Sequence, residues 1–258
     1  MQRFEQGFLS PDWPAPDGVH AICTTRAGGV SSAPYDSLNL GVHVGDDPVH
    51  VAANRAIFAQ AIGAHPVFLN QVHGTQVVTL DASTPDGTVA DASLTDQLGM
   101  ACSVMMADCL PVLFSAANVQ RVAAAHAGWR GLVGADGAGI LETTIQRLQA
   151  TDMQANDIIA WLGPCIGPAA FEVGDEVRAA FAASDARAGE FFKPLTTGKW
   201  LADLAALARL RLRAIGISQS YGNDSSPAWC TVGNASHFFS YRRDRVTGRF
   251  CASIWREG

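Results

Sequence analysis

Three side chains that can bind a metal or act as nucleophiles each lie within two residues of a glycine or a proline. They are His73 in NQVHGT (70–75), Cys109 in ADCLP (107–111) and His126 in AAHAGWR (124–130). Two imidazoles and one thiolate leave the fourth position of a tetrahedral zinc site open, as in catalytic zinc centres. Zinc in such a site lowers the pKa of its bound water to about 7. Because the gaps of 36 and 17 residues match no compact zinc motif, only the fold can bring these residues together.

The same residues permit two other interpretations. Cys109 and His126 fit a hydrolase in which the thiolate attacks an amide. A non-enzymatic binding module with a structural zinc is the third interpretation, and it needs a fourth ligand from Cys102, Cys165 or Cys230. Asp108, next to Cys109, is suited to orienting a ligand or carrying a proton.

Several arginines occur where they could bind an anion. Arg26 follows a predicted strand, Arg130 lies between glycine and tryptophan neighbours in GWRG, and Arg242 begins the run RRDR. The guanidinium fork matches phosphate and carboxylate groups. The alternative for positions 242–245 is a solvated turn in which Asp244 is the partner of the arginines. With 18 basic and 24 acidic residues the net charge is −6, so we expect no nucleic-acid partner.

Short strands and helices must position these residues. The pattern predicts helices at 47–63, 138–148, 175–183 and 201–215, the first of which begins at Asp47-Pro48 and ends at Gly63. It predicts strands at 19–25, 67–72, 76–80, 100–107, 111–116, 120–126, 158–162, 228–232 and 250–254. Strands and helices do not alternate regularly, which favours an α+β fold over a doubly wound sheet.

Length and composition indicate a globular protein. Its 258 residues are 48% hydrophobic and 16% charged, which excludes a disordered protein. The first residues lack the apolar core of an export signal, and no segment predicts a membrane span. We therefore expect a cytoplasmic protein whose six cysteines stay reduced, with a monomer as the expected state.

The sequence resembles the YfiH-type family, whose members carry the names laccase-domain protein, polyphenol oxidase, purine nucleoside phosphorylase and peptidoglycan editing factor. The resemblance covers nearly the whole chain in the order of the family's motifs. The matching segments are TTRAGGVSS (24–32), SLNLG (37–41), HVGDD (43–47), NQVHG (70–74), ADCLP (107–111), AHAGWRG (125–131), GPCIG (163–167), FEVG (171–174) and FSYRRD (239–244).

The resemblance implies a single domain over residues 1–258, built as an α/β/β/α-type sandwich like the catalytic domains of cytotoxic necrotising factors. It implies that His73, Cys109 and His126 are both the catalytic residues and the ligands of a zinc ion, with copper as the other possible metal. Within the matching segments, Arg26, Asn39, Arg130 and Arg242 are the expected substrate-binding residues, and Trp129 or Phe239 the expected stacking partner of a base.

The family's activities imply a small-molecule substrate and no membrane partner. They are phosphorolysis of adenosine, inosine and methylthioadenosine, with adenosine deamination as a companion reaction. The alternative is an amidase that removes serine from the cell-wall precursor UDP-MurNAc-L-Ser. A four-copper laccase does not fit, because its copper sites need on the order of ten histidines and the chain has seven.

Overall fold

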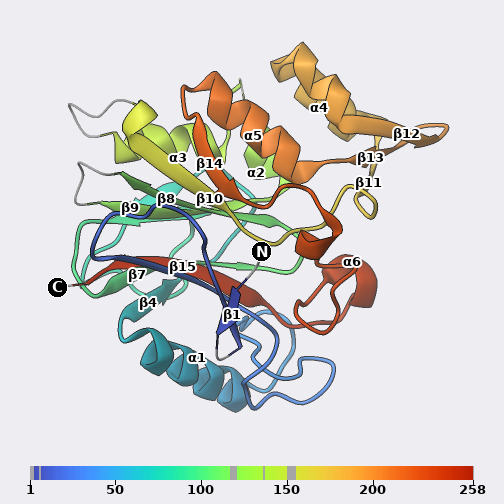
Figure 1. The fold of residues 1–258 in the computed structure, drawn as a ribbon. Helices are drawn as coiled ribbons and strands as arrows, with labels where there is room; N and C mark the ends of the chain where they lie inside the picture. The colour runs from blue at the N-terminus through green and yellow to red at the C-terminus, as the bar shows by residue number, and fades with distance from the viewer. Residues whose placement is uncertain (1–2, 6, 117–120, 136, 150–154, 258) are drawn as a thin grey trace.

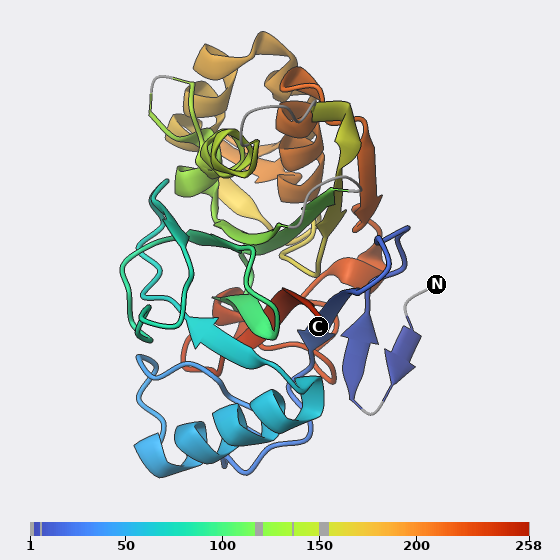
Figure 2. The same ribbon diagram turned by 90° about the vertical axis from the view of Figure 1, so that its left-hand side faces the viewer.

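Two six-stranded sheets packed face to face form the centre of the protein, and helices cover the outer face of each. The structure is a computed structural model that describes residues 3–5, 7–116, 121–135, 137–149 and 155–257. In Figure 1, α1 lies beneath the lower sheet, and α2, α3 and α5 lie above the upper one. The α/β/β/α sandwich predicted for an α+β protein is confirmed, and Figure 2 shows the same layers from the side.

The first sheet places strands from the two ends of the chain side by side. Its order is β1-β2-β3-β15-β7-β4, with bounds Arg3–Glu5, Phe8–Ser10, Val19–Thr24, Phe250–Arg256, Met100–Met106 and His65–Phe68. The second sheet has the order β14-β10-β8-β9-β6-β5, with bounds Gln219–Gly222, Ile158–Leu162, Leu110–Ala116, Val122–Ala127, Ala92–Thr95 and Val77–Thr79.

The remaining elements flank these sheets. A three-stranded sheet has the order β11-β13-β12, with bounds Glu172–Gly174, Lys199–Ala202 and Phe192–Thr196. The helices are α1 Pro48–Ile62, α2 Trp129–Val133, α3 Ile140–Leu148, α4 Asp175–Ser184, α5 Leu204–Ala214 and α6 Tyr241–Asp244, and the 3₁₀ helices are η1 Ala155–Asp157, η2 Ala186–Phe191 and η3 Pro227–Trp229. No helix in these described ranges is long and apolar enough to cross a membrane.

One apolar layer lies between the two large sheets and one lies on the outer face of each, which explains why the central strands are continuously hydrophobic in sequence. Val104, Leu113 and Trp161 pack between the two large sheets. Phe114 packs on the opposite face of its sheet among residues of α3 and α5, and Met105 packs on the α1 side of the first sheet. Because both faces of β7 and β8 are covered, all seven residues of each strand are buried.

The first predicted helix is confirmed in detail. The side chain of Asp47 accepts a hydrogen bond from the backbone N–H of Val49 at 2.8 Å, and Pro48 occupies the first helical turn. Gly63 ends α1 in the left-handed conformation, with φ 62°. A glycine adopts this conformation without steric cost.

Three predicted elements differ from the structure. Residues 228–232 form no strand, because the side chain of Asn234 donates to the carbonyl groups of Pro227, Ala228 and Cys230 and takes the place of a neighbouring strand. The predicted helix at 201–215 begins at Leu204 instead, since Leu201 and Ala202 pair with β12. The strand predicted at 67–72 covers His65–Phe68. Position 120 of another predicted strand lies outside the described residues.

The candidate metal centre and its cavity

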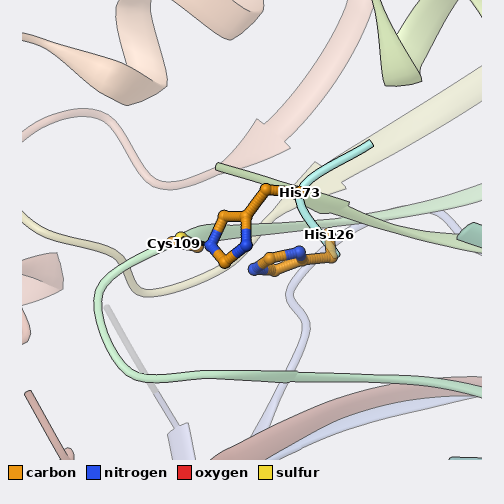
Figure 3. A group of neighbouring side chains, drawn as sticks. All are labelled: His73, Cys109 and His126. Atoms are coloured by element: carbon orange, nitrogen blue, oxygen red, sulfur yellow. Dashed lines mark hydrogen bonds between the residues drawn. The ribbon is translucent and has the colours of Figure 1, made fainter. Parts of the chain in front are cut away.

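The structure brings His73, Cys109 and His126 together from three separate segments (Figure 3). His73 lies between β4 and β5, Cys109 lies where the chain passes from β7 in one sheet to β8 in the other, and His126 is in β9. Their donor atoms all lie within 4.8 Å of one another. Cys109 Sγ is 3.6 Å from His73 Nε2, and the two imidazole centroids are 4.9 Å apart.

A fully buried carboxylate, Asp91, holds both histidines in place. Its Oδ1 accepts from the backbone N–H of His73 at 2.9 Å and lies 2.9 Å from His126 Nδ1. Its Oδ2 accepts from the backbone N–H groups of Val72 and Gly74, at 3.1 and 2.7 Å. With Nδ1 bound to Asp91, His126 presents Nε2 to the cluster, which is the arrangement that orients histidine ligands in metal sites.

The charges within the cluster shift its proton affinities strongly. Burial raises the pKa of the Cys109 thiol, but the charge of His126 and hydrogen bonds from both imidazoles outweigh burial and lower it to about 6. Burial lowers the pKa of His126, but the Cys109 thiolate and Asp91 outweigh burial and raise it to about 9. Burial also opposes ionisation of Asp91, yet hydrogen bonds from His126, Gly74 and Val72 keep its pKa below the usual value. The cluster is therefore built to hold a thiolate.

Close backbone packing explains the glycines beside His126. A Cβ atom at Gly128 would lie 2.7 Å from His73 Cδ2 and 3.1 Å from Cys109 Sγ. A Cβ atom at Gly131 would lie 2.7 Å from the carbonyl oxygen of Gly74. The segment that follows His126 thus approaches the other two cluster residues so closely that only glycine fits at these positions.

Asp108 fixes the connection that carries Cys109. Its backbone has φ 101°, and its Oδ1 accepts from Thr231 Oγ1 at 2.6 Å. Its Oδ2 accepts from the backbone N–H of Arg242, also at 2.6 Å. Asp108 therefore ties the β7–β8 connection to α6 rather than hydrogen-bonding to a cluster ligand.

The cluster faces a cavity of about 360 Å³. Its lining combines apolar and aromatic side chains with imidazole and guanidinium groups. The lining residues are His43, Gln71, His73, Met105, Met106, Ala107, Asp108, Cys109, His126, Trp129, Ile166, Phe171, Leu204, Tyr241, Arg242 and Arg249. This size and mixture are typical of a small-molecule site.

Of the four expected substrate-binding residues, Arg242 is the one that lines this cavity. Its guanidinium donates to the carbonyl oxygens of Ala170 and Glu172, which fixes its orientation. Arg26 instead donates to Asp36 and the Ala235 carbonyl, and Arg130 is exposed with its guanidinium over the Trp129 ring. Asn39 is fully buried in hydrogen bonds to other parts of the chain.

The two residues expected to stack on a base lie in different surroundings. Trp129 lines the cavity, whereas Phe239 is fully buried and lies under the Arg26 guanidinium, so it cannot stack on a ligand. Sequence patterns left out Phe171, Asp91 and Arg249. Asp91 precedes the short strand β6. The sequence around it does not indicate that four hydrogen-bond donors surround its carboxylate.

Comparisons with known proteins show which family the chain belongs to. Residues 20–257 match the family described as multi-copper polyphenol oxidoreductase laccase. The chain is 51% identical over 251 residues to the purine nucleoside phosphorylase YfiH of Escherichia coli strain K12, covering 96% of this chain and 98% of that protein. A purine nucleoside phosphorylase of Pseudomonas aeruginosa is 48% identical over 249 residues, with the same two coverages. The chain belongs to the YfiH-type family.

Solved structures of YfiH-type and related proteins share the fold. The crystal structure of a Neisseria meningitidis protein is 47% identical and superposes with a TM-score of 0.91, covering 98% of this chain and 100% of that one. YlmD from Geobacillus stearothermophilus is 32% identical, with a TM-score of 0.88 and coverages of 100% and 98%. The likeness therefore extends over the whole sandwich and includes the three segments that form the cluster.

The residues of this YfiH-type cluster fit a metal ion. One thiolate and two imidazoles suit zinc and copper, and Asp91 supplies the carboxylate that orients a histidine ligand. Among the residues that the structure describes, no further His, Cys, Asp or Glu side chain joins the three. A structural zinc site takes four protein ligands, so the cluster has the composition of a site with an open position.

Proposed function

We propose that this protein is a zinc-dependent purine nucleoside phosphorylase that acts on adenosine, inosine and methylthioadenosine. The observation that supports it is a three-ligand cluster facing a cavity that combines an apolar aromatic wall with cationic groups. The names of the relatives from E. coli and P. aeruginosa point the same way. Copper is the other metal that this ligand set accepts.

Each part of the cavity has a role in this reaction. Trp129 offers a ring surface for a purine, since aromatic pairs gain from stacked or edge-on contact. Arg242 is held by backbone carbonyl groups and presents a cation to phosphate. His73, Cys109 and His126 would hold the metal, which supplies Lewis-acid chemistry when bound. Phosphorolysis breaks the bond between the base and C1′ and joins a phosphate oxygen to C1′.

Adenosine deamination is proposed as a companion reaction at the same centre. It replaces the 6-amino group of the base with oxygen from water and releases ammonia. Both reactions place a purine in the cavity, so they share the aromatic wall and the cluster. Loss of any one cluster ligand is therefore expected to remove both activities together.

Product analysis tests the phosphorylase proposal. Inosine with phosphate is expected to give hypoxanthine and ribose 1-phosphate, and no hypoxanthine without phosphate. His73→Ala is expected to lower the rate at least about 100-fold, the scale on which catalytic groups contribute. His65→Ala is the matched control, because His65 is exposed at the start of β4 and is not among the residues that line the cavity. Release of free ribose independent of phosphate would contradict the proposal.

One observation favours a second candidate, a thiol amidase that acts on a serine-containing cell-wall precursor. Cys109, His126 and Asp91 have the order of groups found in nucleophile–base–acid triads, and the pKa of Cys109 is about 6. The thiolate would attack the amide carbonyl and expel the amine after it takes up a proton, leaving a thioester that water hydrolyses. A thioester trapped on Cys109 by mass spectrometry, with activity that survives a chelator, would favour this candidate over the phosphorylase.

A further inference from the structure

Besides the cluster, the cavity contains three groups that attract anions. They are the guanidinium groups of Arg242 and Arg249 and the imidazole of His43. Arg249 precedes β15 in the first sheet, Arg242 is in α6, and His43 is in the loop before α1. Three unrelated segments thus place cationic or hydrogen-bonding side chains on one cavity.

Arg249 is a cation without a carboxylate partner in the described part of the chain. Its Nη1 donates to the carbonyl oxygens of Thr247 and Gly248, at 3.2 and 3.0 Å, and no described residue accepts from its Nε or Nη2. Two other arginines with low exposure are paired with carboxylates, Arg55 with Asp86 at 2.9 Å and Arg211 with Glu142 at 2.8 Å, whereas half-buried Arg209 is held by several backbone carbonyl groups. Burial lowers the pKa of Arg249, and the charges of Cys109, Asp108 and Tyr241 offset part of this effect without forming an ion pair with it. A desolvated charge is costly unless it is paired, so a bound anion would stabilise it.

The backbone around Arg249 is fixed in place. Its N–H donates to Asn39 Oδ1 at 2.8 Å, and its carbonyl oxygen accepts from the N–H of Leu40 at 3.0 Å. A Cβ atom at Gly41 would lie 2.7 Å from Arg249 Cγ, so the side chain packs directly on this loop. The fully buried Asn39 therefore supports Arg249, and the loop that continues from it carries His43.

His43 adds a neutral hydrogen-bonding group. Partial desolvation and the charges of Arg249 and Arg55 lower the pKa of its imidazole. At neutral pH it can therefore donate a hydrogen bond with one ring nitrogen and accept one with the other. Such a group suits an oxyanion that still carries a proton.

We infer that Arg249, together with His43 and Arg242, forms the subsite that binds inorganic phosphate. The inference rests on the proposed phosphorylase function and adds the residues that bind the second substrate. The planar fork of Arg249 has two unused donor atoms, Nε and Nη2, which match two oxygens of a tetrahedral oxyanion. The position in the same cavity as the cluster and the aromatic wall puts phosphate next to the nucleoside.

Steady-state kinetics at varied phosphate test the inference. Arg249→Met keeps the packed stem and removes the charge, and it is expected to raise the KM for phosphate about 100-fold, because the charge-assisted hydrogen bonds to the oxyanion are lost. The KM for inosine is expected to stay within about threefold. Arg249→Lys is expected to restore part of the loss as a point charge. Arg213→Met, at an exposed arginine of α5, is the control with the same change in net charge.

A binding measurement separates this inference from the proposed function. Calorimetry with inorganic phosphate alone on the metal-loaded protein is expected to show binding that Arg249→Met abolishes, while urea unfolding shows that the variant is folded. If phosphate binds in this way but inosine is not cleaved, the phosphorylase proposal fails and the subsite stands. Phosphorolysis with an unchanged phosphate KM in Arg249→Met would overturn the subsite. So would Arg249-dependent binding of nucleoside diphosphates without binding of free phosphate.

Discussion

Asp91 is the residue on which the geometry of the cluster depends most. It is fully buried and receives hydrogen bonds from three backbone N–H groups and from His126. Removing it would leave these donors without an acceptor, and each unsatisfied buried donor costs about 1–3 kcal/mol. A single carboxylate therefore links the fold of the 72–74 loop to the orientation of the His126 imidazole.

Asp91→Asn is expected to weaken zinc binding by about 10–100-fold, the usual effect of losing a carboxylate behind a histidine ligand. The amide presents N–H groups to donors that need an acceptor, so His126 loses its fixed orientation. Zinc titration against a competing chelator measures the change. Asp17→Asn, at an exposed carboxylate, is the control. Unchanged zinc affinity in Asp91→Asn would show that Asp91 does not orient the ligand.

Gly128→Ala tests the close packing of the cluster without changing any ligand. Its Cβ would lie 2.7 Å from His73 Cδ2, so the imidazole must move away from Cys109. We expect metal affinity and activity to fall at least about tenfold, because a small misplacement of a reacting group has effects of this order or more. In Gly189→Ala the new methyl group has its nearest neighbour at 4.0 Å, and both properties should stay at the parent level. Equal activity in the two variants would refute the packing argument.

The lowered pKa of Cys109 predicts a pH dependence in the metal-free protein. The thiolate exists above about pH 6 and is lost as the pH falls through this value. Alkylation of Cys109 is therefore expected to reach half its maximal rate near pH 6 and then to level off. Burial raises the pKa of Cys102 and Cys251 to about 12, so they should stay unmodified. Peptide mass spectrometry after timed labelling measures this, and a midpoint near 9 for Cys109 would contradict the electrostatic account.

A substitution in helix α1 is expected to lower the stability of the protein without changing its activity. Asp47→Ala removes the side-chain hydrogen bond to Val49 at its N-terminus and is expected to cost about 1 kcal/mol of unfolding free energy. None of the cavity-lining residues belongs to α1, so kcat should not change. Urea unfolding and inosine turnover measure the two effects. Lost turnover with unchanged stability would mean that α1 contributes to the site directly.

Elements with strong local signals were predicted well from sequence. Asp47, Pro48 and Gly63 mark the ends of α1, and the apolar runs of β7 and β8 correspond to strands covered on both faces. The strand predicted at 228–232 failed because a side chain just beyond it, Asn234, donates to the carbonyl groups that a neighbouring strand would otherwise engage, which an apolar pattern does not show. Short strands such as β6, with the sequence ASLT, form through their neighbours and carry little pattern of their own.

The sequence selected some residues of the candidate site and not others. The sequence selected His73, Cys109 and His126 because each is a metal-binding residue type near a chain breaker and because the family resemblance selects the same three, and the structure brings them together. The sequence did not select Arg249 because an arginine before a strand has no distinctive pattern, and only the tertiary structure shows that no carboxylate of the described residues pairs with it. Arg26 and Asn39 stand in specific motifs, but the structure places them in the hydrogen-bonded loops around the site.

At the level of the whole molecule, the sandwich explains how an acidic protein offers an anion site. The net charge is −6, yet the cavity contains two arginines and a cluster that can hold a metal cation. A cleft with low-dielectric walls concentrates the field of such charges. The cavity receives residues from the connections of both large sheets, from α5 and from α6, so both layers must be formed before it exists.

A zinc titration of the metal-free protein tests the central claim most directly. Ribose 1-phosphate formation from inosine and phosphate is followed as zinc is added. The account predicts almost no activity before zinc, a rise to a plateau at one zinc per chain, and no rise in His126→Ala. Full phosphorolysis in the metal-free protein, or a plateau in His126→Ala equal to that of the parent, would contradict it.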